Sequence, residues 1–387
     1  MADSLSNDAP PRALIVSSVH DYRTGKRGSI QSVADAFASL GYKTTFLSIR
    51  FSPLSLIKKD SRAFLWNRAN RVEARGGVEC YLWRTPWHPF AMKSEFGNSV
   101  TAPLHSFYAE SSNGEVDKRI READVIVVES GLGIALLPRM RRLNPRAALC
   151  YRGADALDTI GAHPHLQSLL QRHAGMVDHF CLLAEQMAPH FTFARDKTYV
   201  VPQGIEAVQY ESIGPNPYDT PVNAVSVGSM LFDPSFFTFA AKRFPQIMFH
   251  VIGCGTTFDA PHNVRIYPEM AFLETLPYLA HADIGLAPYH DTPNGGYLAR
   301  SSLKLTQYAY LRRPAVCPHF AVGGRAHRFG YQPGNHGEIE EALKRALADT
   351  YAAHDARPMS WTEVAQRLMR PSDFADTAIA AHEFETV

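Results

Sequence analysis

One stretch of the chain, residues 287–318, combines the residue types that proteins use to hold a diphosphate. It reads APYHDTPNGGYLARSSLKLTQYAYLRRPAVCP, which predicts a strand end, a glycine loop, a helix and a further buried strand. Ser301 and Ser302 are typical helix N-cap residues, and Lys304 follows one turn into the predicted helix. The free N–H groups at such a helix start, together with an ammonium, suit a diphosphate. The alternative is an ordinary capped helix between two strands.

A second candidate is a carboxylate that follows a predicted strand in the first half of the chain. The run YRGADALDTI places Asp155 in a strand-to-helix loop, where it can act as a general base on a hydroxyl. Asp158, one turn later, can orient that base or cap the helix. Capping is the commoner role of an Asp in such a loop, so both interpretations stay open.

Three more residues stand at predicted strand ends of the second half. Met230 follows NAVSVGS and can pack on a flat base or sugar, although a Met there is more often part of a core. Glu269 follows the strand VRIY and can accept hydrogen bonds from ribose hydroxyls, or be a solvated loop residue. Tyr289 ends a strand just before the glycine loop, where it can reach a nucleobase or a phosphate.

Several common motifs are missing, and their absence narrows the chemistry. The chain has no D-x-D for a metal–diphosphate clamp, no P-loop and no complete G-x-G-x-x-G. Seventeen histidines occur without a zinc-binding spacing, so no metal site or bound cofactor is expected. The net charge of +1 gives no overall field for nucleic acid, and nucleic-acid binding is not expected.

Five cysteines without a C-x-x-C spacing are typical of packed thiols in a reducing compartment. We see no signal peptide and no apolar run near the roughly 20 residues of a membrane-spanning helix. The protein is therefore expected in the cytosol, where it can lie on a membrane surface.

Strand and helix patterns alternate along the whole chain, which predicts an α/β protein with parallel sheets. At 387 residues, two domains are the natural expectation. We expect two doubly wound, Rossmann-like domains facing a cleft, with ligands outside the carboxyl ends of the strands. The expected boundaries are residues 1–205 for the first domain, 206–221 for a Pro- and Gly-rich linker and 222–360 for the second domain, with a helix in 361–387 that returns to the first.

The segment from Arg50 to Arg75 holds seven basic residues and two acidic ones, interleaved with large apolar residues. This composition is typical of an interfacial membrane anchor. The alternative is a solvated basic face beside core residues. The candidate membrane contacts are Lys58, Lys59, Arg62, Trp66 and Arg68.

Taken together, the sequence resembles a known family, the xanthan-type bacterial glucuronosyltransferases or GumK family. The matching runs follow one order over nearly the full length, among them SSVHDYRT, CYLWRTPWHPF, YRGADALDTI, VGSMLFDPSFF, SSLKLTQY and RFGYQPGN. The resemblance implies a GT-B type fold. It also implies an inverting, metal-independent transfer of glucuronate from UDP-glucuronate to a mannose of a polyprenyl-diphosphate-linked oligosaccharide, at the cytoplasmic face of the inner membrane.

By the same resemblance Asp155 is the catalytic base. The residues implied to bind the donor are Met230, Glu269, Tyr289, Ser301, Ser302, Leu303, Lys304 and Gln307. Two positions depart from the family pattern, since Leu303 replaces a Met and Glu206 replaces an Asp. The roles of Asp158 and Glu206 stay open.

Two other functions use the same features. One is a different UDP-sugar enzyme on this fold, such as a retaining transferase or an epimerase, which would not use Asp155 as its base. The other is a non-catalytic adaptor at the membrane surface. Product stereochemistry separates the first from an inverting transferase, and measured transfer from UDP-glucuronate excludes the second.

Overall fold

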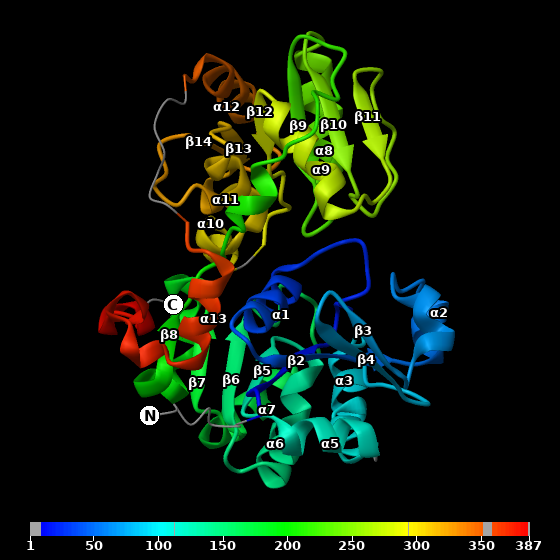
Figure 1. The fold of residues 1–387 in the computed structure, drawn as a ribbon. Helices are drawn as coiled ribbons and strands as arrows, with labels where there is room; N and C mark the ends of the chain where they lie inside the picture. The colour runs from blue at the N-terminus through cyan, green and yellow to red at the C-terminus, as the bar shows by residue number, and fades with distance from the viewer. Residues whose placement is uncertain (1–8, 112, 293, 351–357, 386–387) are drawn as a thin grey trace, which may run out of the picture.

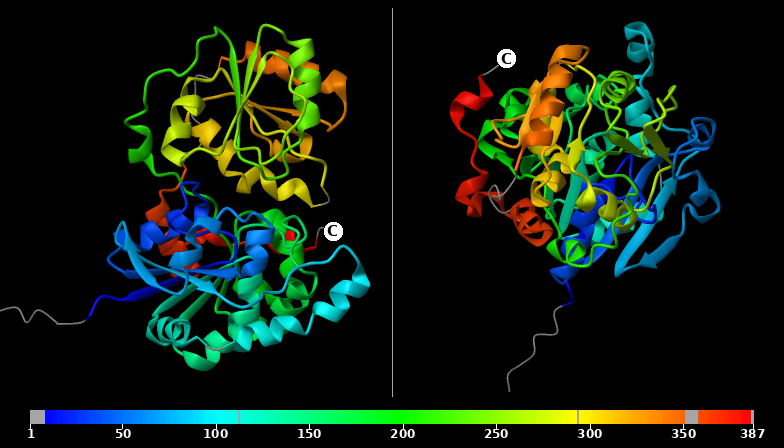
Figure 2. Two further views of the ribbon diagram at one scale, coloured as in Figure 1. Left: turned by 90° about the vertical axis from the view of Figure 1, so that its right-hand side faces the viewer. Right: turned by 90° about the horizontal axis from the view of Figure 1, so that it is seen from above.

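The chain forms two α/β lobes, each built on a parallel sheet, in a computed structural model that describes residues 9–111, 113–292, 294–350 and 358–385 (Figure 1). Runs of Val, Ile and Leu are buried on both faces of each sheet, as in ALIV of the first strand, because helices cover both sides. Figure 2 shows the lobes stacked, with the C-terminal segment on the first lobe.

The first lobe contains an eight-stranded sheet. The edge strand β3 (Val72–Arg75) runs antiparallel to its neighbour β4, and the other strands of the sheet are parallel. In spatial order the strands are β3 (Val72–Arg75), β4 (Val78–Arg84), β2 (Lys43–Phe51), β1 (Arg12–Ser17), β5 (Val125–Glu129), β6 (Ala148–Gly153), β7 (His179–Leu182) and β8 (Thr198–Val200). The sequence reading missed the short strand β3.

The helices of the first lobe pack on both faces of this sheet. They are α1 (Ser29–Ser39), α2 (Pro53–Ile57), α3 (Glu95–Thr101), α4 (Leu104–Glu110), α5 (Gly114–Glu122), α6 (Leu137–Leu143), α7 (His165–Arg172) and α13 (Trp361–Met369). The last of these comes from the end of the chain. Its buried residues Trp361, Val364 and Leu368 share a core cluster with Val33 and Phe37 of α1.

The second lobe contains a six-stranded, all-parallel sheet. Its spatial order is β11 (Val264–Tyr267), β10 (Met248–Ile252), β9 (Asn223–Val227), β12 (Ile284–Leu286), β13 (Ala315–Pro318) and β14 (Arg328–Tyr331). Its helices are α8 (Pro234–Arg243), α9 (Phe272–His281), α10 (Leu298–Ser301), α11 (Leu303–Tyr310) and α12 (His336–Ala348). Strand order reverses around β9 and β12, which is the switch point where such sheets bind ligands.

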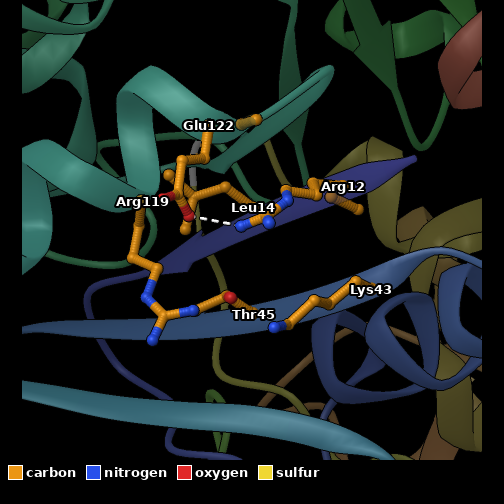
Figure 3. A pocket seen from close by; sticks show the side chains of 8 residues that line it. Arg12, Leu14, Lys43, Thr45, Arg119 and Glu122 are labelled. Atoms are coloured by element: carbon orange, nitrogen blue, oxygen red, sulfur yellow. Dashed lines mark hydrogen bonds and ion pairs between the residues drawn. The ribbon is translucent and has the colours of Figure 1, made fainter. Parts of the chain in front are cut away.

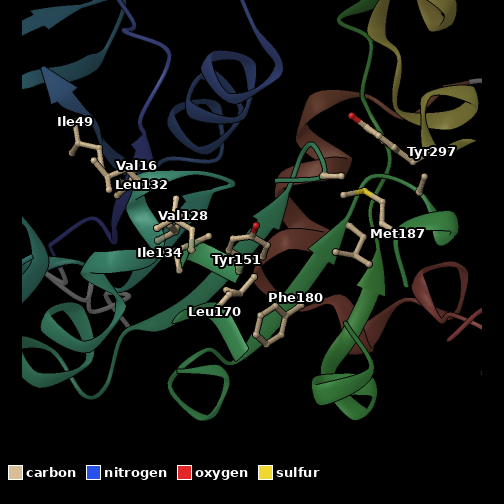
Figure 4. Packing of buried hydrophobic residues seen from close by; sticks show 14 of the residues in the cluster. Val16, Ile49, Val128, Leu132, Ile134, Tyr151, Leu170, Phe180, Met187 and Tyr297 are labelled. Atoms are coloured by element: carbon tan, nitrogen blue, oxygen red, sulfur yellow. The ribbon is translucent and has the colours of Figure 1, made fainter. Parts of the chain in front are cut away.

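The two lobes touch through apolar as well as polar residues. One hydrophobic cluster contains Val128 and Tyr151 of the first sheet together with Tyr297 of the second lobe (Figure 4). Leu298 of the second lobe belongs to the same cluster. The five cysteines are all buried and unbridged, as packed thiols. No helix in the described parts of the chain is long and apolar enough to cross a membrane.

Candidate active site between the two lobes

The serine-rich segment forms two short helices rather than one. Ser301 is the last residue of α10, and Ser302 alone caps α11, where its hydroxyl accepts the Leu305 N–H at 3.3 Å. The interpretation of Ser301 as an N-cap is therefore wrong. Its hydroxyl is buried and has no partner among the described residues, so it is free to bind a ligand. The break arises because Ser302 has an extended backbone that starts a new helix.

Lys304 is the second residue of α11, earlier in the helix than the sequence suggested. Its ammonium lies 5.2 Å from the centre of the Tyr289 ring. Burial lowers the pKa of Lys304 to about 8, and the charge of Lys26 lowers it further. A half-buried ammonium that no carboxylate pairs with, in the part of the chain described, is suited to an incoming anion.

Tyr289 is buried beneath this helix start. Its hydroxyl lies 2.6 Å from the Ser302 hydroxyl, and its ring supports the Lys304 ammonium. The contacts of this tyrosine hold the N-cap and the lysine in place. Tyr289 thus supports two residues of the candidate donor site, Ser302 and Lys304.

Glu269 and Met230 lie at the carboxyl edge of the second sheet, near a lysine of the first lobe. The Lys26 ammonium forms an ion pair with Glu269 at 3.1 Å and lies 3.4 Å from the Ser229 hydroxyl. Met230, next to Ser229, is 36% exposed, so it is not a core residue. Glu269, which the sequence assigned to the ribose hydroxyls, is therefore paired with Lys26 in this structure. A ribose that binds Glu269 must share this carboxylate with Lys26 or break the ion pair.

Leu303 and Gln307 line a small pocket between the lobes. Arg27 and Gly28 contribute from the first lobe, and Glu206 contributes from the segment that joins the lobes. The pocket is only about 20 Å³. The side of α11 that carries Leu303 and Gln307 thus faces the start of α1.

Asp155 lies in a turn after β6, and no helix begins there, since α7 starts only at His165. The helix-capping alternative for Asp155 is therefore excluded. Its backbone N–H donates to the Ser130 hydroxyl at 3.2 Å, and its carboxylate accepts the Tyr297 hydroxyl of the other lobe at 3.3 Å. Burial raises the pKa of Asp155 to about 6, and the nearby Glu129 raises it further. A carboxylate in this range is suited to general base work near neutral pH.

Asp158 is exposed and has a different role. Its carboxylate accepts the backbone N–H of Thr159 at 2.8 Å and the side-chain amide of Asn294 at 3.1 Å. The first contact closes a turn and the second joins the lobes. Asp158 does not contact Asp155 in any interaction of the described residues, so it does not orient that carboxylate.

Two sets of buried polar contacts lie near Asp155, and the second set connects the lobes. Ser17 donates to Glu129 at 2.6 Å, and burial raises the pKa of Glu129 to about 7. The fully buried Arg152 reaches the Gln203 amide oxygen at 3.5 Å, and the Gln203 amide donates to the Ser301 carbonyl at 3.1 Å. The position of Ser301 is thus tied to the strand that carries Asp155.

Sequence reasoning missed Lys26, Glu129 and Tyr297. Glu129 ends a predicted strand, and Lys26 and Tyr297 follow glycines in loops. These positions are a usable signal, because the carboxyl ends of parallel strands gather at one edge. The contacts of Lys26 with Glu269 and of Tyr297 with Asp155 cross between the lobes and had no sequence signal.

Two other hollows differ sharply in position. Asp155 borders a cavity of about 280 Å³ in the first lobe, whose wall includes His163, Gln167, Met187 and Phe191. This size suits a sugar. A hollow of about 10 Å³ lies instead at the amino ends of β1 and β2, where Arg12 pairs with Glu122 (Figure 3). It is too small and on the wrong sheet edge for a substrate.

One of the five predicted membrane residues, Arg62, is not at the surface. Arg62 is buried, with 1% of its side chain exposed, because it pairs with Asp60 and donates to the carbonyls of Ile49 and Arg50. The prediction that Arg62 contacts the membrane is therefore wrong. Lys58 and Lys59 are exposed.

Two further members of that set are engaged in local contacts. Trp66 is half-buried, and its ring packs on Phe51 and carries the Arg84 guanidinium at 4.6 Å. Arg68 is exposed but forms a bidentate pair with Glu73.

Solved structures with the same arrangement define the class of fold. Sucrose-phosphate synthase from Thermosynechococcus elongatus matches with a TM-score of 0.59 at 14% identity, over 94% of this chain and 96% of that chain. An α,α-trehalose-phosphate synthase (UDP-forming) from Burkholderia xenovorans matches with a TM-score of 0.57 at 13% identity, over 94% and 100%. The fold is thus of the GT-B glycosyltransferase type, as predicted.

The family follows from closer sequence matches. Residues 15–183 match the N-terminal domain of the glucuronosyltransferase GumK family. A UDP-glucuronate:glycolipid 2-beta-glucuronosyltransferase of Xanthomonas campestris pv. campestris is 38% identical over 370 residues, or 95% of this chain and 92% of that protein. The chain belongs to the GumK family of glucuronosyltransferases, which confirms the resemblance and the expectation of an enzyme.

Proposed function

We propose that this protein transfers glucuronate from UDP-glucuronate to a sugar hydroxyl of a lipid-linked oligosaccharide, with inversion and without a metal ion. The observation that carries the proposal is the arrangement around the lobe boundary. A carboxylate with a raised pKa, Asp155, is joined to the lobe that holds Lys304 and the start of α11. The relative from Xanthomonas, named for this donor and a glycolipid acceptor, supports the choice of substrates.

In the proposed reaction the acceptor hydroxyl enters from the cavity beside Asp155. The Asp155 carboxylate takes the hydroxyl proton while the new bond to the anomeric carbon forms. On the opposite face of the sugar, the bond to UDP breaks and its electron pair leaves with the diphosphate. Lys304 and the N–H groups at the start of α11 stabilise this charge, which is the work that a metal ion does in other transferases.

The acceptor sugar is proposed to be a mannose, and its carrier a polyprenyl diphosphate, as the family resemblance implies. The 280 Å³ cavity supports a sugar as the acceptor group because it mixes apolar walls with the side-chain amide of Gln167, which can bind hydroxyl groups. The rival enzymes on this fold are separated by their products, since a retaining transferase gives the other anomer and an epimerase transfers nothing.

We place the protein at the cytoplasmic face of the membrane, bound peripherally. Large apolar side chains are exposed on two helices of the first lobe. Ile57 of α2 is 78% exposed and precedes the exposed Lys58 and Lys59, and Phe96 of α3 is 80% exposed. This combination favours an interfacial contact, in which apolar groups insert and cations meet anionic lipid.

The function is tested by radiolabel transfer from a panel of UDP-sugars to lipid extracts, followed by assignment of the product anomer. Inverted product from UDP-glucuronate alone is expected. Label transfer from another UDP-sugar, or none, would contradict the donor assignment.

Membrane binding is tested by sedimentation with anionic vesicles. Changing Lys58 and Lys59 to Ser should weaken binding, and the binding of the unchanged protein should fall at 1 M salt, where the Debye length is about 3 Å. The matched control changes the exposed Lys118 and Arg121 of α5 to Ser. Equal loss in both variants would show an effect of net charge only.

A further inference from the structure

A second cavity of the first lobe, about 60 Å³, lies next to the one that Asp155 borders. It is enclosed by the loops after β1, β4, β5 and β6 and by Arg50 near the end of β2, at the carboxyl edge of the sheet, where parallel sheets bind ligands. Ala162 and His163 line both cavities, so the turn that follows Asp155 forms their shared wall. The volume exceeds the 10–15 Å³ or so that one water needs, and no part of the mechanism above uses it.

Arg50 supplies the only formal charge in the lining of this cavity. No Asp or Glu is among the lining residues, and within the described parts of the chain no acceptor or carboxylate binds the Arg50 guanidinium. Burial lowers the pKa of Arg50, and the charge of the neighbouring Arg62 lowers it further, while the charge of Asp60 raises it. Asp60 forms its ion pair with Arg62 and not with Arg50. A half-buried guanidinium without a carboxylate bonded to it favours an anion that arrives from outside.

The backbone of Arg50 is strained, and its neighbours hold it so. Its φ is 59°, in the left-handed region that non-glycine residues avoid, beside an irregularity in the pairing of β2 with β4. Its N–H donates to the Tyr108 hydroxyl at 3.0 Å. Arg62 donates to the carbonyls of Ile49 and Arg50 at 2.9 and 3.0 Å. Strain that is fixed this firmly is typical of residues at functional sites.

Two further basic residues lie near the cavity or near Arg50. The Lys58 ammonium lies 4.6 Å from the ring centre of Phe90, which lines the cavity. His88 is buried, and its Nδ1 has no partner among the described residues. The charges of Arg50, Arg62 and Lys58 all act on His88, and the one carboxylate acting on it, Asp60, is already paired with Arg62.

From these observations we infer that Arg50, with Lys58 at the rim, binds a phosphoryl group, namely the diphosphate of the lipid-linked acceptor. The inference rests on the proposed function and adds the position of the diphosphate. It fits the layout of the lobe, because the sugar cavity with Asp155 lies on one side. On the other side, the lining residues Ala91 and His105 adjoin α3 and α4, which carry exposed apolar residues such as Phe96.

The test compares two acceptors with the same oligosaccharide. One is linked to its lipid through a diphosphate and the other through an uncharged alkyl glycoside. Arg50→Gln should raise KM for the diphosphate acceptor on the order of 10–100-fold, the loss of a charge-assisted contact, and leave kcat and the donor KM unchanged. The alkyl glycoside should be used equally by variant and unchanged enzyme. An equal loss with both acceptors, or no loss with either, would overturn the inference.

The controls separate misfolding and other sources of phosphate. Arg50→Lys, which keeps a charge, should recover part of the acceptor affinity, and Arg71→Gln, at an exposed position, should leave it unchanged. Vesicles of anionic phospholipid should bind Arg50→Gln as well as the unchanged protein; loss of that binding would assign the site to a phospholipid headgroup instead.

Inorganic diphosphate provides a readout that needs no transfer. Calorimetric titration should show a site in the protein saturated with UDP that is lost in Arg50→Gln and kept in Arg71→Gln. Transfer to neither acceptor by the unchanged enzyme, with this diphosphate site present, would refute the proposed function and leave the anion site standing. Absence of the site would refute the inference, whatever the transfer assay gives.

Discussion

The two lobes present opposite chemistry at the carboxyl ends of their parallel sheets. The first lobe offers carboxylates, Asp155 and behind it Glu129, whose pKa values burial raises. The second lobe offers the Ser302 hydroxyl and the Lys304 ammonium, and burial lowers the pKa of Lys304. Burial thus moves both pKa values toward neutral pH, that of Asp155 upward and that of Lys304 downward.

In the proposed mechanism, placing the two charged groups on different lobes keeps them from neutralising each other. A base and a cation placed in one pocket would form an ion pair and lose both functions. Here Asp155 meets only a neutral hydroxyl of the second lobe, from Tyr297, while Lys304 packs on Tyr289. In the proposed mechanism, the substrates bind between a carboxylate and an ammonium that do not pair with each other, and the surrounding lobes exclude water from both.

The largest expected effect comes from removing the base of the first lobe. Asp155→Asn should lower transfer by about 10²–10⁴-fold, the usual contribution of a general base, and leave UDP binding intact. Initial rates and UDP titration check this. Asp158→Asn is the matched control, because this exposed carboxylate closes only a turn and a contact to Asn294. Near-full activity of Asp155→Asn with loss in Asp158→Asn would show the wrong carboxylate was chosen.

Removing the cation of the second lobe should have the next largest effect. Lys304→Ala should weaken use of UDP-glucuronate by about 1.5–3 kcal/mol in kcat/KM, the range of a hydrogen bond to a charged group. Lys242→Ala, at an exposed end of α8 in the same lobe, should change nothing. Unchanged kcat/KM in Lys304→Ala would remove this lysine from the donor site.

The opposite pKa shifts of the two lobes predict a bell-shaped pH profile. Asp155 must be ionised, so kcat/KM should rise with pH through about 6. Lys304 must be protonated, so kcat/KM should fall with pH above about 8. The profile of Lys304→Ala should lack the upper limb. A flat profile across pH 5–7 in the unchanged enzyme would contradict Asp155 as the base.

A smaller effect should follow from cutting the contact between the lobes. The Tyr297 hydroxyl donates to the Asp155 carboxylate and lowers its pKa, so Tyr297→Phe should move the acid limb to higher pH. Tyr199→Phe, at the half-buried edge strand β8, should leave the limb in place. A shift to lower pH in Tyr297→Phe would mean that the tyrosine acts in another way.

The smallest expected effect is that of a chelator. Since Lys304 and the start of α11 are proposed to carry the diphosphate charge, EDTA should leave transfer unchanged. Inactivation by EDTA that magnesium reverses would reveal a metal requirement and weaken the contrast between the lobes.

Much of this layout was predictable from local sequence. Runs such as ALIVS and VIVVE form parallel strands that are buried on both faces, because continuous apolar runs rich in Val and Ile favour strands covered by helices on both sides. The strand ends then fixed which loops gather at the sheet edge, and with them Asp155, Glu269 and Lys304. The short strand β3 escaped prediction, since VEAR is mostly exposed and gains its place by pairing with β4.

Other features were decided only by tertiary structure. Arg62 belongs to a basic run in the sequence, yet it is buried, because Asp60 and two carbonyls lie within its reach. The pKa values of Asp155 and Lys304 depend on burial between segments more than a hundred residues apart. Local sequence determines backbone preference and the identity of each charged group. What neighbours that group, and therefore its charge state and its freedom to bind a substrate, is settled only when distant segments pack together.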